Sequence, residues 1–398
     1  MRKEKILLIV DRVQEFSLYV LLFYIPISNA IIESLFGVAF LCFIIKKALQ
    51  PDFSFLKSKI TFALLLFVIF NFLSLINSGP YLIKGLKAIF LKWLEYIGIF
   101  ILVSDSFSNR KRMRNAVIIL FLSSFLVGID GICQKFFQLE FLRGKPILEV
   151  KDGIYAITAS FNHYNGLGAY LIIPLSLAVS MFFVSGIKNK YRIITFFLAG
   201  VLLACLSFTF SRGSWIGFIS SLALMTLLTK RFKLIGGIFL VFSAFLLSDP
   251  ALRARILFTF SPYGDADRFL VWGTAFRMIR ENPFLGKGIG TFMDYFHAYT
   301  PQLFVQYAHN CFLQIWAETG IFSLLSFLSF IYLLLSGAIK VFKGNNKFVL
   351  LGLTCGIFGY LAHSFFDTQL YSLQLAVFFW YMAGLTYSLF IRKIDVFS

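Results

Sequence analysis

Residues 321–338 read "IFSLLSFLSFIYLLLSGA", a run of 18 residues without one charged side chain. A helix needs about 20 mainly apolar residues to cross the hydrocarbon core of a bilayer, so this run has the composition and almost the length of a membrane span. Similar runs recur along the 398-residue chain, which is 59% hydrophobic and only 14% charged. Lipid cannot hydrogen-bond an open backbone, so repeated runs predict helices rather than an open sheet. We therefore expect an all-α, polytopic integral membrane protein.

Working outward from this run, we predict a single membrane domain over residues 1–398, a helical bundle of about 12 transmembrane helices. Residues 249–309 lack a comparable run, and we expect them to form a large, partly helical loop within that domain. The predicted spans are roughly 14–29, 31–46, 60–78, 82–103, 115–135, 163–184, 192–210, 213–229, 233–248, 310–336, 348–366 and 371–391.

The connections between these spans alternate in charge. Segments such as "NRKRMR" (109–114) and "KRFK" (230–233) are basic, whereas "NSGPY" (77–81) and "FFDTQLY" (365–371) carry no cation. Short loops rich in Lys and Arg stay in the cytoplasm. Both termini are therefore expected in the cytoplasm and the 249–309 loop on the outer side. Most of the net charge of +18 is thus a topology signal, and we expect no nucleic-acid partner.

Two arginines depart from this charge pattern because they fall on the outer side. Arg212 lies in the tight turn "FTFSRGSWIG" (208–217), at the start of a helix whose free N–H groups favour anions. Arg268 lies in the first turn of a helix predicted over residues 267–282, where a cation opposes the helix dipole. Either arginine could simply snorkel from a helix end. The alternative is that both bind an anion. The predicted apolar face of the second helix consists of Phe269, Trp272, Phe276 and Ile279.

Two short motifs near Arg268 superficially suggest a metal or a phosphate loop. Asp265 and Asp267 form "DAD", but helix capping accounts for Asp267 and three-residue matches are common. The segment "GKGIG" (286–290) lacks a preceding strand and a Lys-Ser/Thr ending, so we predict an ordinary turn. We therefore expect no metal and no cofactor.

His309 stands immediately before the span 310–336. On that helix Asn310, Gln314 and Glu318 recur every fourth residue and form one polar stripe. Glu318 lies about 13 Å along the helix from His309 and on the opposite side, so it is not expected to orient the histidine. A boundary histidine is often only an interfacial residue. Together with Arg212 and Arg268, however, it suits substitution at a carbon that bears a diphosphate, because arginines bind phosphate oxygens and an imidazole can accept a hydroxyl proton.

The order of these motifs resembles the O-antigen ligase and O-antigen polymerase superfamily. The segment "SFNHYNGLGAYL" (160–171), which contains His163 and Asn165, also resembles that family's sequence before its sixth helix. The similarity covers about residues 160–320, and the remainder matches only as a bundle of spans. The matching pieces are Ser211-Arg212-Gly213, Asp267-Arg268 with Trp272, residues 283–292 and residues 309–320.

This resemblance implies an inverting, metal-independent glycosyltransferase of the bacterial inner membrane with an active site facing the periplasm. The implied donor is a glycan on undecaprenyl diphosphate, used among membrane lipids without a cofactor. By motif, Arg212 and Arg268 would contact the diphosphate and His309 would activate the acceptor hydroxyl. The same resemblance suggests supporting or substrate-binding roles for His163, Asn165, Asn310 and Glu318.

The acceptor separates the alternatives within this family. A ligase passes the glycan to lipid A-core, whereas a polymerase passes it to another lipid-linked repeat unit. The compact chain with one dominant outward loop favours a ligase, and related ligases that glycosylate proteins share the motifs. A lipid-oligosaccharide flippase or another transporter is the rival from a different class. It would place functional charges near mid-membrane in paired halves, which this sequence does not show.

Overall fold

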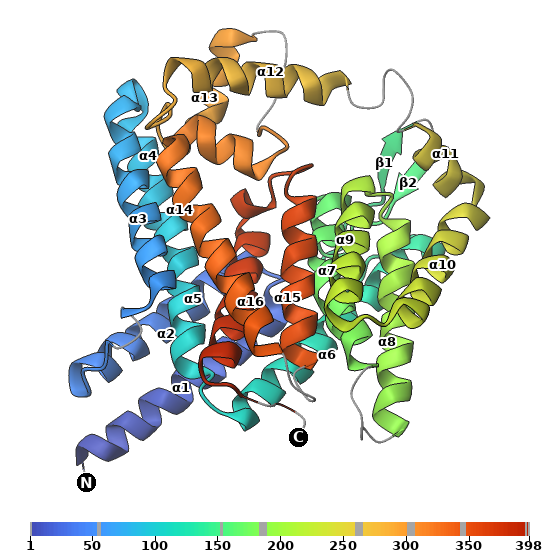
Figure 1. Cartoon of the computed structure of the whole chain (residues 1–398), viewed down its shortest axis with the longest axis horizontal. Coiled ribbons are helices and arrows are strands. Elements are labelled where there is room, and N and C mark those ends of the chain that lie inside the picture. The colour runs from blue at the N-terminus through green and yellow to red at the C-terminus, as the bar shows by residue number, and fades with distance from the viewer. Residues whose placement is uncertain are drawn as a thin grey trace.

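The computed structural model describes residues 2–53, 57–151, 154–182, 189–258, 266–300, 307–342, 348–394 and 396. Almost all of the regular structure is helical, as Figure 1 shows, and the expectation of an all-α bundle is confirmed apart from one small hairpin. The helices are α1 Arg2–Tyr24, α2 Asn29–Leu49, α3 Lys59–Leu73, α4 Leu82–Ala88, α5 Leu94–Ser106, α6 Arg110–Phe137, α7 Tyr164–Met181, α8 Asn189–Phe208, α9 Arg212–Thr229, α10 Phe232–Ser248, α11 Pro250–Phe258, α12 Ala266–Glu281, α13 Phe292–Tyr299, α14 Cys311–Phe342, α15 Phe348–His363 and α16 Leu373–Ile391.

Short elements join some of these helices. The hairpin pairs β1 Leu148–Lys151 with β2 Ile154–Ala156 in antiparallel fashion. A π-helical turn, Ile89–Trp93, connects α4 to α5, and 3₁₀ turns cover Ser74–Asn77, Gly79–Tyr81 and Gln369–Tyr371.

A helix underlies each predicted span, but the count of about 12 is not confirmed. In the described part of the chain, 7 helical segments have the length and apolar composition to cross a membrane, and the bent pair formed by α10 and α11 would make an eighth. The predicted span 82–103 is interrupted by the π-helical turn, and α15 has only 16 residues. The repeated apolar helices nevertheless make this a multi-pass membrane protein.

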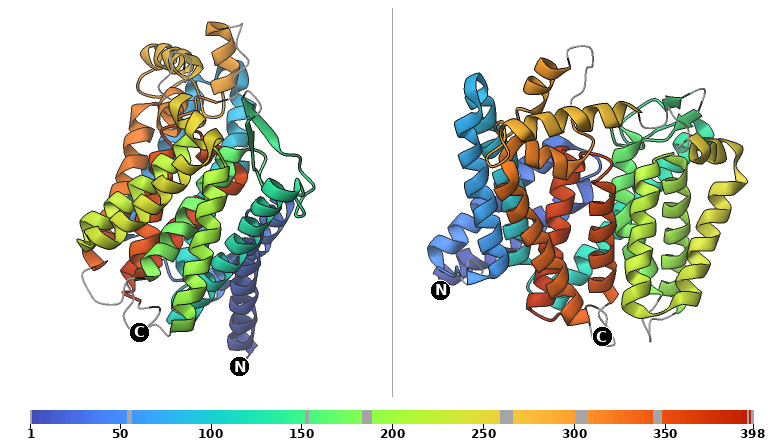
Figure 2. Two further views of the ribbon diagram at one scale, coloured as in Figure 1. Left: turned by 90° about the vertical axis from the view of Figure 1, so that its right-hand side faces the viewer. Right: turned by 45° about the horizontal axis from the view of Figure 1, so that its top comes forward.

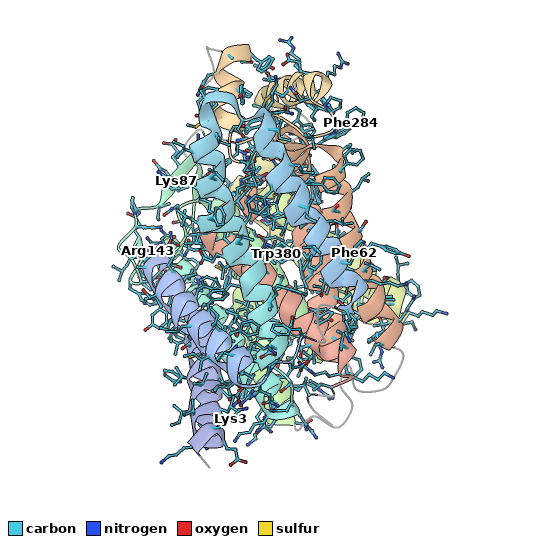
Figure 3. The ribbon with its side chains drawn as sticks, turned by 90° about the vertical axis from the view of Figure 1, so that its left-hand side faces the viewer. Lys3, Phe62, Lys87, Arg143, Phe284 and Trp380 are labelled. Atoms are coloured by element: carbon cyan, nitrogen blue, oxygen red, sulfur yellow. The ribbon has the colours of Figure 1, made fainter. Side chains whose placement is uncertain are left out.

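The interior of the bundle is built round α7 and α16. Almost every side chain of these two helices is buried, and Trp380 of α16 is fully enclosed. Figure 3 shows Trp380 inside the bundle, between Lys3 near one end and Phe284 near the other. Phe62 of α3 lies on the outside of the bundle and is 59% exposed, as expected of a side chain that faces lipid.

Helices α9 and α15 approach each other closely because glycines line their contact. A Cβ atom added to Gly217 would lie 2.6 Å from the carbonyl oxygen of Gly359, and one added to Gly359 would lie 2.4 Å from that of Gly217. Small residues allow two helices in a membrane to pack backbone against backbone. This contact fixes the start of α9, which carries Arg212, against the end of α15.

The predicted 249–309 loop is partly helical, as expected, and contains α11, α12 and α13. Both termini lie at one end of the bundle and α12 and α13 at the opposite end, in all three views of Figures 1 and 2. A separate apolar cluster attaches α12 and α13 to the start of α14. Its members include Val271, Ala275, Met278, Phe292, Phe296, Leu313 and Ala317.

The predicted apolar face of α12 is partly wrong. Phe269 and Phe276 are 67% and 48% exposed, whereas Val271, Ala275 and Met278 are buried. The helix packs on α13 and α14 through Val271, Ala275 and Met278, each of which lies one residue before a predicted position. These three side chains belong to the apolar cluster described above. The helix begins at Ala266, so Asp267 lies in its first turn and not at its N-cap.

Ion pairs tie the helices together at the end that holds the termini. Lys46 binds Asp11 and Asp105 at 3.0 and 2.8 Å, and Lys47 binds Asp105 at 2.7 Å. Arg112 binds Glu15 at 2.9 Å. Cations of the basic connections thus gather at one end of the bundle, as the charge alternation predicts.

Candidate active site

His309 and Asp367 form the central pair of the candidate site. His309 Nδ1 lies 3.3 Å from Asp367 Oδ1, although the two residues are 58 positions apart. The His309 side chain is 44% exposed and that of Asp367 is 19% exposed, so the pair borders open space. His309 also has a left-handed backbone, with φ of 49°, which is uncommon for a residue with a side chain.

Two further contacts hold these residues together. The Cys311 N–H donates to the Ser364 carbonyl at 2.8 Å, and the Cys311 thiol donates to the Asp367 carbonyl at 3.3 Å. The turn before α14 is therefore fastened to the connection between α15 and α16. This fastening places the imidazole of His309 over the carboxylate.

Asp367 is an ionised carboxylate. Burial acts to raise its pKa, but the hydrogen bond from His309, the nearby His363 ring and the Thr368 N–H outweigh burial and hold the pKa well below its usual range. The carboxylate can only accept, so the Nδ1–H of His309 donates to it. The Nε2 atom of His309 is then the ring nitrogen without a proton, which can accept one.

Sequence reasoning missed Asp367. The acid stands in "FFDTQLY" (365–371), which contributed only to the topology argument. The available signal was a lone carboxylate in an outward connection with no other charge, but nothing in its spacing pointed to His309.

His163 and Asn165 lie beside this pair, at the start of α7. The His163 Nδ1 atom caps α7 by accepting from the Asn165 N–H at 3.2 Å. Burial lowers the pKa of His163, the Asp367 carboxylate acts against that shift, and His309 adds to it. The three groups therefore lie within electrostatic range of one another. The Asn165 side-chain oxygen accepts from the Ser211 hydroxyl at 2.7 Å, which joins α7 to the start of α9.

Arg212 is the first residue of α9 and follows the N-cap Ser211. Gly213 touches the ring of His363, because a Cβ atom added there would lie 2.6 Å from its Cδ2 atom. Phe210 has a left-handed backbone, with φ of 52°, and its carbonyl accepts from the Nε–H of Arg255 at 3.2 Å. The Arg212 turn is thus held between α15 and α11.

Arg268 comes to the same region through α12. The indole N–H of Trp272 donates to the Ala308 carbonyl at 3.1 Å, which fixes α12 to the residue before His309. The charge of Arg268 acts on His363, as does that of Asp367. The charges of Arg268 and Asp367 therefore both act on His363, and Gly213, next to Arg212, touches the His363 ring, so these elements meet in one region of the fold.

The Asn310–Gln314–Glu318 stripe exists, but it points into the protein. Asn310 Oδ1 accepts from the Leu313 N–H at 2.9 Å and caps α14. Gln314 Oε1 accepts from the Ala308 N–H at 3.0 Å, and its amide donates to Glu318 Oε1 at 3.2 Å. The stripe therefore fixes the backbone just before His309.

Glu318 is only 1% exposed, and its oxygens are occupied by backbone donors. Glu318 Oε2 accepts from the Gly290 N–H at 3.0 Å, and Oε1 accepts from the Phe292 N–H at 3.2 Å. Glu318 was expected to contact a substrate, but it is buried and has almost no surface exposed to open space. Its observed role is to hold the 286–292 segment, and we do not carry it into the proposed binding set.

The "GKGIG" segment (286–290) is a turn, as predicted. This turn packs on a break in α14. Gly320 interrupts α14 with φ of 81° and ψ of 175°, and the Ile321 N–H donates to the Pro283 carbonyl at 3.0 Å. A Cβ atom on Gly320 would lie 2.0 Å from the Phe284 carbonyl oxygen. The Lys287 and Gly288 N–H groups donate to the Ala317 and Glu318 carbonyls at 2.9 and 2.8 Å. These amides are used within the protein and do not form a phosphate cradle.

An apolar groove of about 630 Å³ begins beside this site. Asn310 and Trp272 lie among its lining residues, and most of its wall is apolar. Because it runs along two helices of the bundle, its shape and composition fit a hydrocarbon chain. The apolar wall includes Phe312, Leu328, Ile331 and Leu335 of α14 and Phe358 and Leu361 of α15.

The metal alternative involves residues that are largely undescribed. Asp265 lies outside the described residues, and the Asp267 side chain is likewise not described. Within the described ranges, no group of three or more His, Cys, Asp or Glu side chains is placed to hold a metal ion.

Comparison with known families gives one match. Residues 197–328 match the family model described as O-antigen ligase (Wzy_C). The matched stretch runs from α8 into α14 and contains Arg212, Arg268 and His309, but His163 and Asp367 lie outside it. Curated proteins give no match to the chain. Residues 197–328, about a third of the chain, are thus similar to the O-antigen ligase family, and this match supports the resemblance seen in the motifs.

Proposed function

We propose that this protein is an inverting glycosyltransferase that moves a glycan from undecaprenyl diphosphate to lipid A-core. The observation that carries the proposal is the His309–Asp367 pair beside Arg212 and Arg268. A base oriented by a carboxylate suits activation of a hydroxyl, and guanidinium groups suit a departing diphosphate.

The reaction is a single displacement. The acceptor hydroxyl oxygen attacks the anomeric carbon of the donor sugar, and its proton passes to Nε2 of His309. The bond from that carbon to the diphosphate oxygen breaks, and lipid diphosphate leaves with the electron pair. Attack opposite the leaving group inverts the anomeric configuration. Asp367 stabilises the imidazolium that forms, while Arg212 and Arg268 stabilise the charge on the diphosphate.

No metal enters this scheme, because the two guanidinium groups carry the charge stabilisation. His163 and Asn165 lie where they can position the sugar or the acceptor hydroxyl. The apolar groove beside Asn310 would receive a hydrocarbon chain of a lipid substrate while the reacting head group remains at His309.

We place the protein in the bacterial inner membrane with both termini in the cytoplasm and the site facing the periplasm. The gathering of basic connections at the end that holds the termini supports this orientation. A cysteine introduced at position 287 should react with an impermeant thiol reagent from the periplasmic side, since Lys287 belongs to the opposite end. Labelling from the cytoplasm alone would overturn the orientation.

Ligase and polymerase share the donor chemistry and differ in the acceptor. The deciding experiment reconstitutes the protein with a lipid-linked glycan and offers either lipid A-core or a second lipid-linked repeat unit. Transfer to lipid A-core supports the ligase, and transfer only to the repeat unit supports the polymerase. Absence of transfer to both would overturn the transferase proposal and favour a transporter.

His309→Ala should lower turnover by about 10²- to 10⁴-fold, the usual contribution of a general base. Binding of the donor should survive, because the arginines hold the diphosphate. His297→Ala on α13 is the matched control and should leave turnover within about twofold of wild type, since His297 is a histidine with no role assigned in the reaction. If His309→Ala turned over at the wild-type rate, His309 would not be the general base.

A further inference from the structure

A pair of cations stands outside the machinery described so far, in the loop between α6 and the hairpin. The Glu140 carboxylate shapes this loop. Its Oε1 atom accepts from the Arg143 N–H at 2.7 Å, and its Oε2 atom accepts from the Lys145 N–H at 2.5 Å. Glu140 is thus hydrogen-bonded to the backbone of both residues, while its charge still attracts the Lys145 ammonium group.

The side chains of Arg143 and Lys145 converge on one neutral group. Arg143 Nη1 and Lys145 Nζ donate to the Ser160 carbonyl at 3.0 and 3.1 Å, and Lys145 Nζ also donates to Asn162 Oδ1 at 2.5 Å. Neither cation forms an ion pair with any of the described carboxylates. Figure 3 shows Arg143 at the edge of the molecule, away from the interior marked by Trp380.

This convergence has an electrostatic cost. Partial burial and the neighbouring Arg143 guanidinium lower the pKa of Lys145 to about 8, against the opposing attraction of Glu140. Two like charges that share an acceptor repel each other, and an anion between them would remove that repulsion.

The pair also lies next to the candidate site. Asn162, which binds Lys145, directly precedes His163, and Asn165 binds Ser211 beside Arg212. The short segment 162–165 therefore contacts both the Arg143–Lys145 pair and Ser211, the residue before Arg212. Arg212 is assigned to the donor diphosphate, so the Arg143–Lys145 pair is available to the acceptor.

We propose that Arg143 and Lys145 form an anion subsite that binds a phosphate group of the acceptor glycolipid. This inference rests on the proposed transferase function and adds the chemical class of the acceptor. The phosphate could belong to lipid A-core or to the diphosphate of a second lipid-linked repeat unit, and the subsite recognises the chemistry that the two share. A hydrogen bond between charged partners is stronger than one to a neutral carbonyl, so the cations would leave Ser160 for the phosphate.

The test measures steady-state transfer by the full chain with variants Arg143→Met and Lys145→Met. Each should raise the acceptor KM about tenfold, equivalent to about 1.4 kcal/mol, and leave kcat and the donor KM unchanged. Lys145→Arg should restore the acceptor KM. Lys84→Met is the matched control, because Lys84 is an exposed cation paired with Asp294 of α13, and it should leave the acceptor KM unchanged.

Acceptor chemistry and pH supply two independent readouts. With a lipid A-core acceptor whose phosphate monoesters have been removed by a phosphatase, wild type and both methionine variants should have the same KM. Parallel assays with lipid A-core and with the lipid-linked repeat unit identify which phosphate the subsite binds.

Lys145 loses its charge as the pH rises through about 8, so the wild-type acceptor KM should rise there. Lys145→Arg should lack that rise, although Arg143, Glu140 and His163 remain nearby.

An unchanged acceptor KM in both methionine variants would overturn the subsite. The subsite would also be overturned if the methionine variants lowered kcat and the melting temperature but had the same KM for the phosphorylated and dephosphorylated acceptors. That result would mean that Arg143 and Lys145 only stabilise the loop through the Ser160 carbonyl. Failure of the underlying function is distinct, because the wild type would then transfer to no acceptor.

Discussion

Asp367→Asn tests whether the carboxylate acts through His309. The substitution keeps the size of the side chain and removes its charge. Asp367 Oδ1 lies 3.3 Å from His309 Nδ1, which is a charge-assisted contact. Such a hydrogen bond contributes about 1.5–3 kcal/mol, so its loss in the transition state should lower kcat by about 10- to 150-fold. His309 is 44% exposed, and solvent screening places the expected loss nearer the lower bound.

The assay is transfer from a lipid-linked glycan at saturating donor and acceptor. Both KM values should change little, because Asp367 contacts the base and not the substrates. Asp294→Asn is the matched control, since Asp294 of α13 pairs with Lys84 of α4, and the kcat of this variant should stay within about twofold of wild type.

Non-additivity gives the sharper criterion. If Asp367 acts only by orienting and stabilising His309, then Asp367→Asn combined with His309→Ala should be no slower than His309→Ala alone. A full multiplicative loss in the double variant would refute the reasoning, as would wild-type kcat in Asp367→Asn.

Three further outcomes are expected. Arg212→Lys and Arg268→Lys should each recover only part of the transfer lost in the corresponding alanine variants, since an ammonium is a point charge; full recovery would argue against bidentate binding of the diphosphate. Gly320→Ala should destabilise the protein by at least about 2–3 kcal/mol, because the new Cβ atom would lie 2.0 Å from the Phe284 carbonyl oxygen. The melting temperature should fall accordingly. Gly200→Ala is the control and should not lower the melting temperature, because a Cβ atom there meets nothing within 4 Å. Excess EDTA should leave wild-type transfer intact. A loss of transfer that Mg²⁺ or Mn²⁺ rescues would make Asp265 and Asp267 the expected metal ligands.

Local composition was sufficient to predict several features of this protein. Hydropathy marks a membrane helix because each residue of a span meets lipid or another helix wherever the span is placed. The segments containing Arg212, Arg268 and His309 could therefore be placed at helix starts from the sequence. The turn at residues 286–290 was predicted because that segment lacks the preceding strand and the Lys-Ser/Thr ending of a phosphate loop.

Tertiary structure decided what these side chains contact. Asp367 meets His309 across 58 residues, and Glu318 turns to the Gly290 and Phe292 amides. Periodicity predicted the buried face of α12 only in part, with Ile279 buried but Phe269 and Phe276 exposed, because the buried face depends on α13 and α14. Hydropathy and helical period are properties of neighbouring residues, whereas a carboxylate acquires its partner only when distant turns pack together. The sequence alone therefore determined the helical bundle, and the fold alone determined which carboxylate contacts His309.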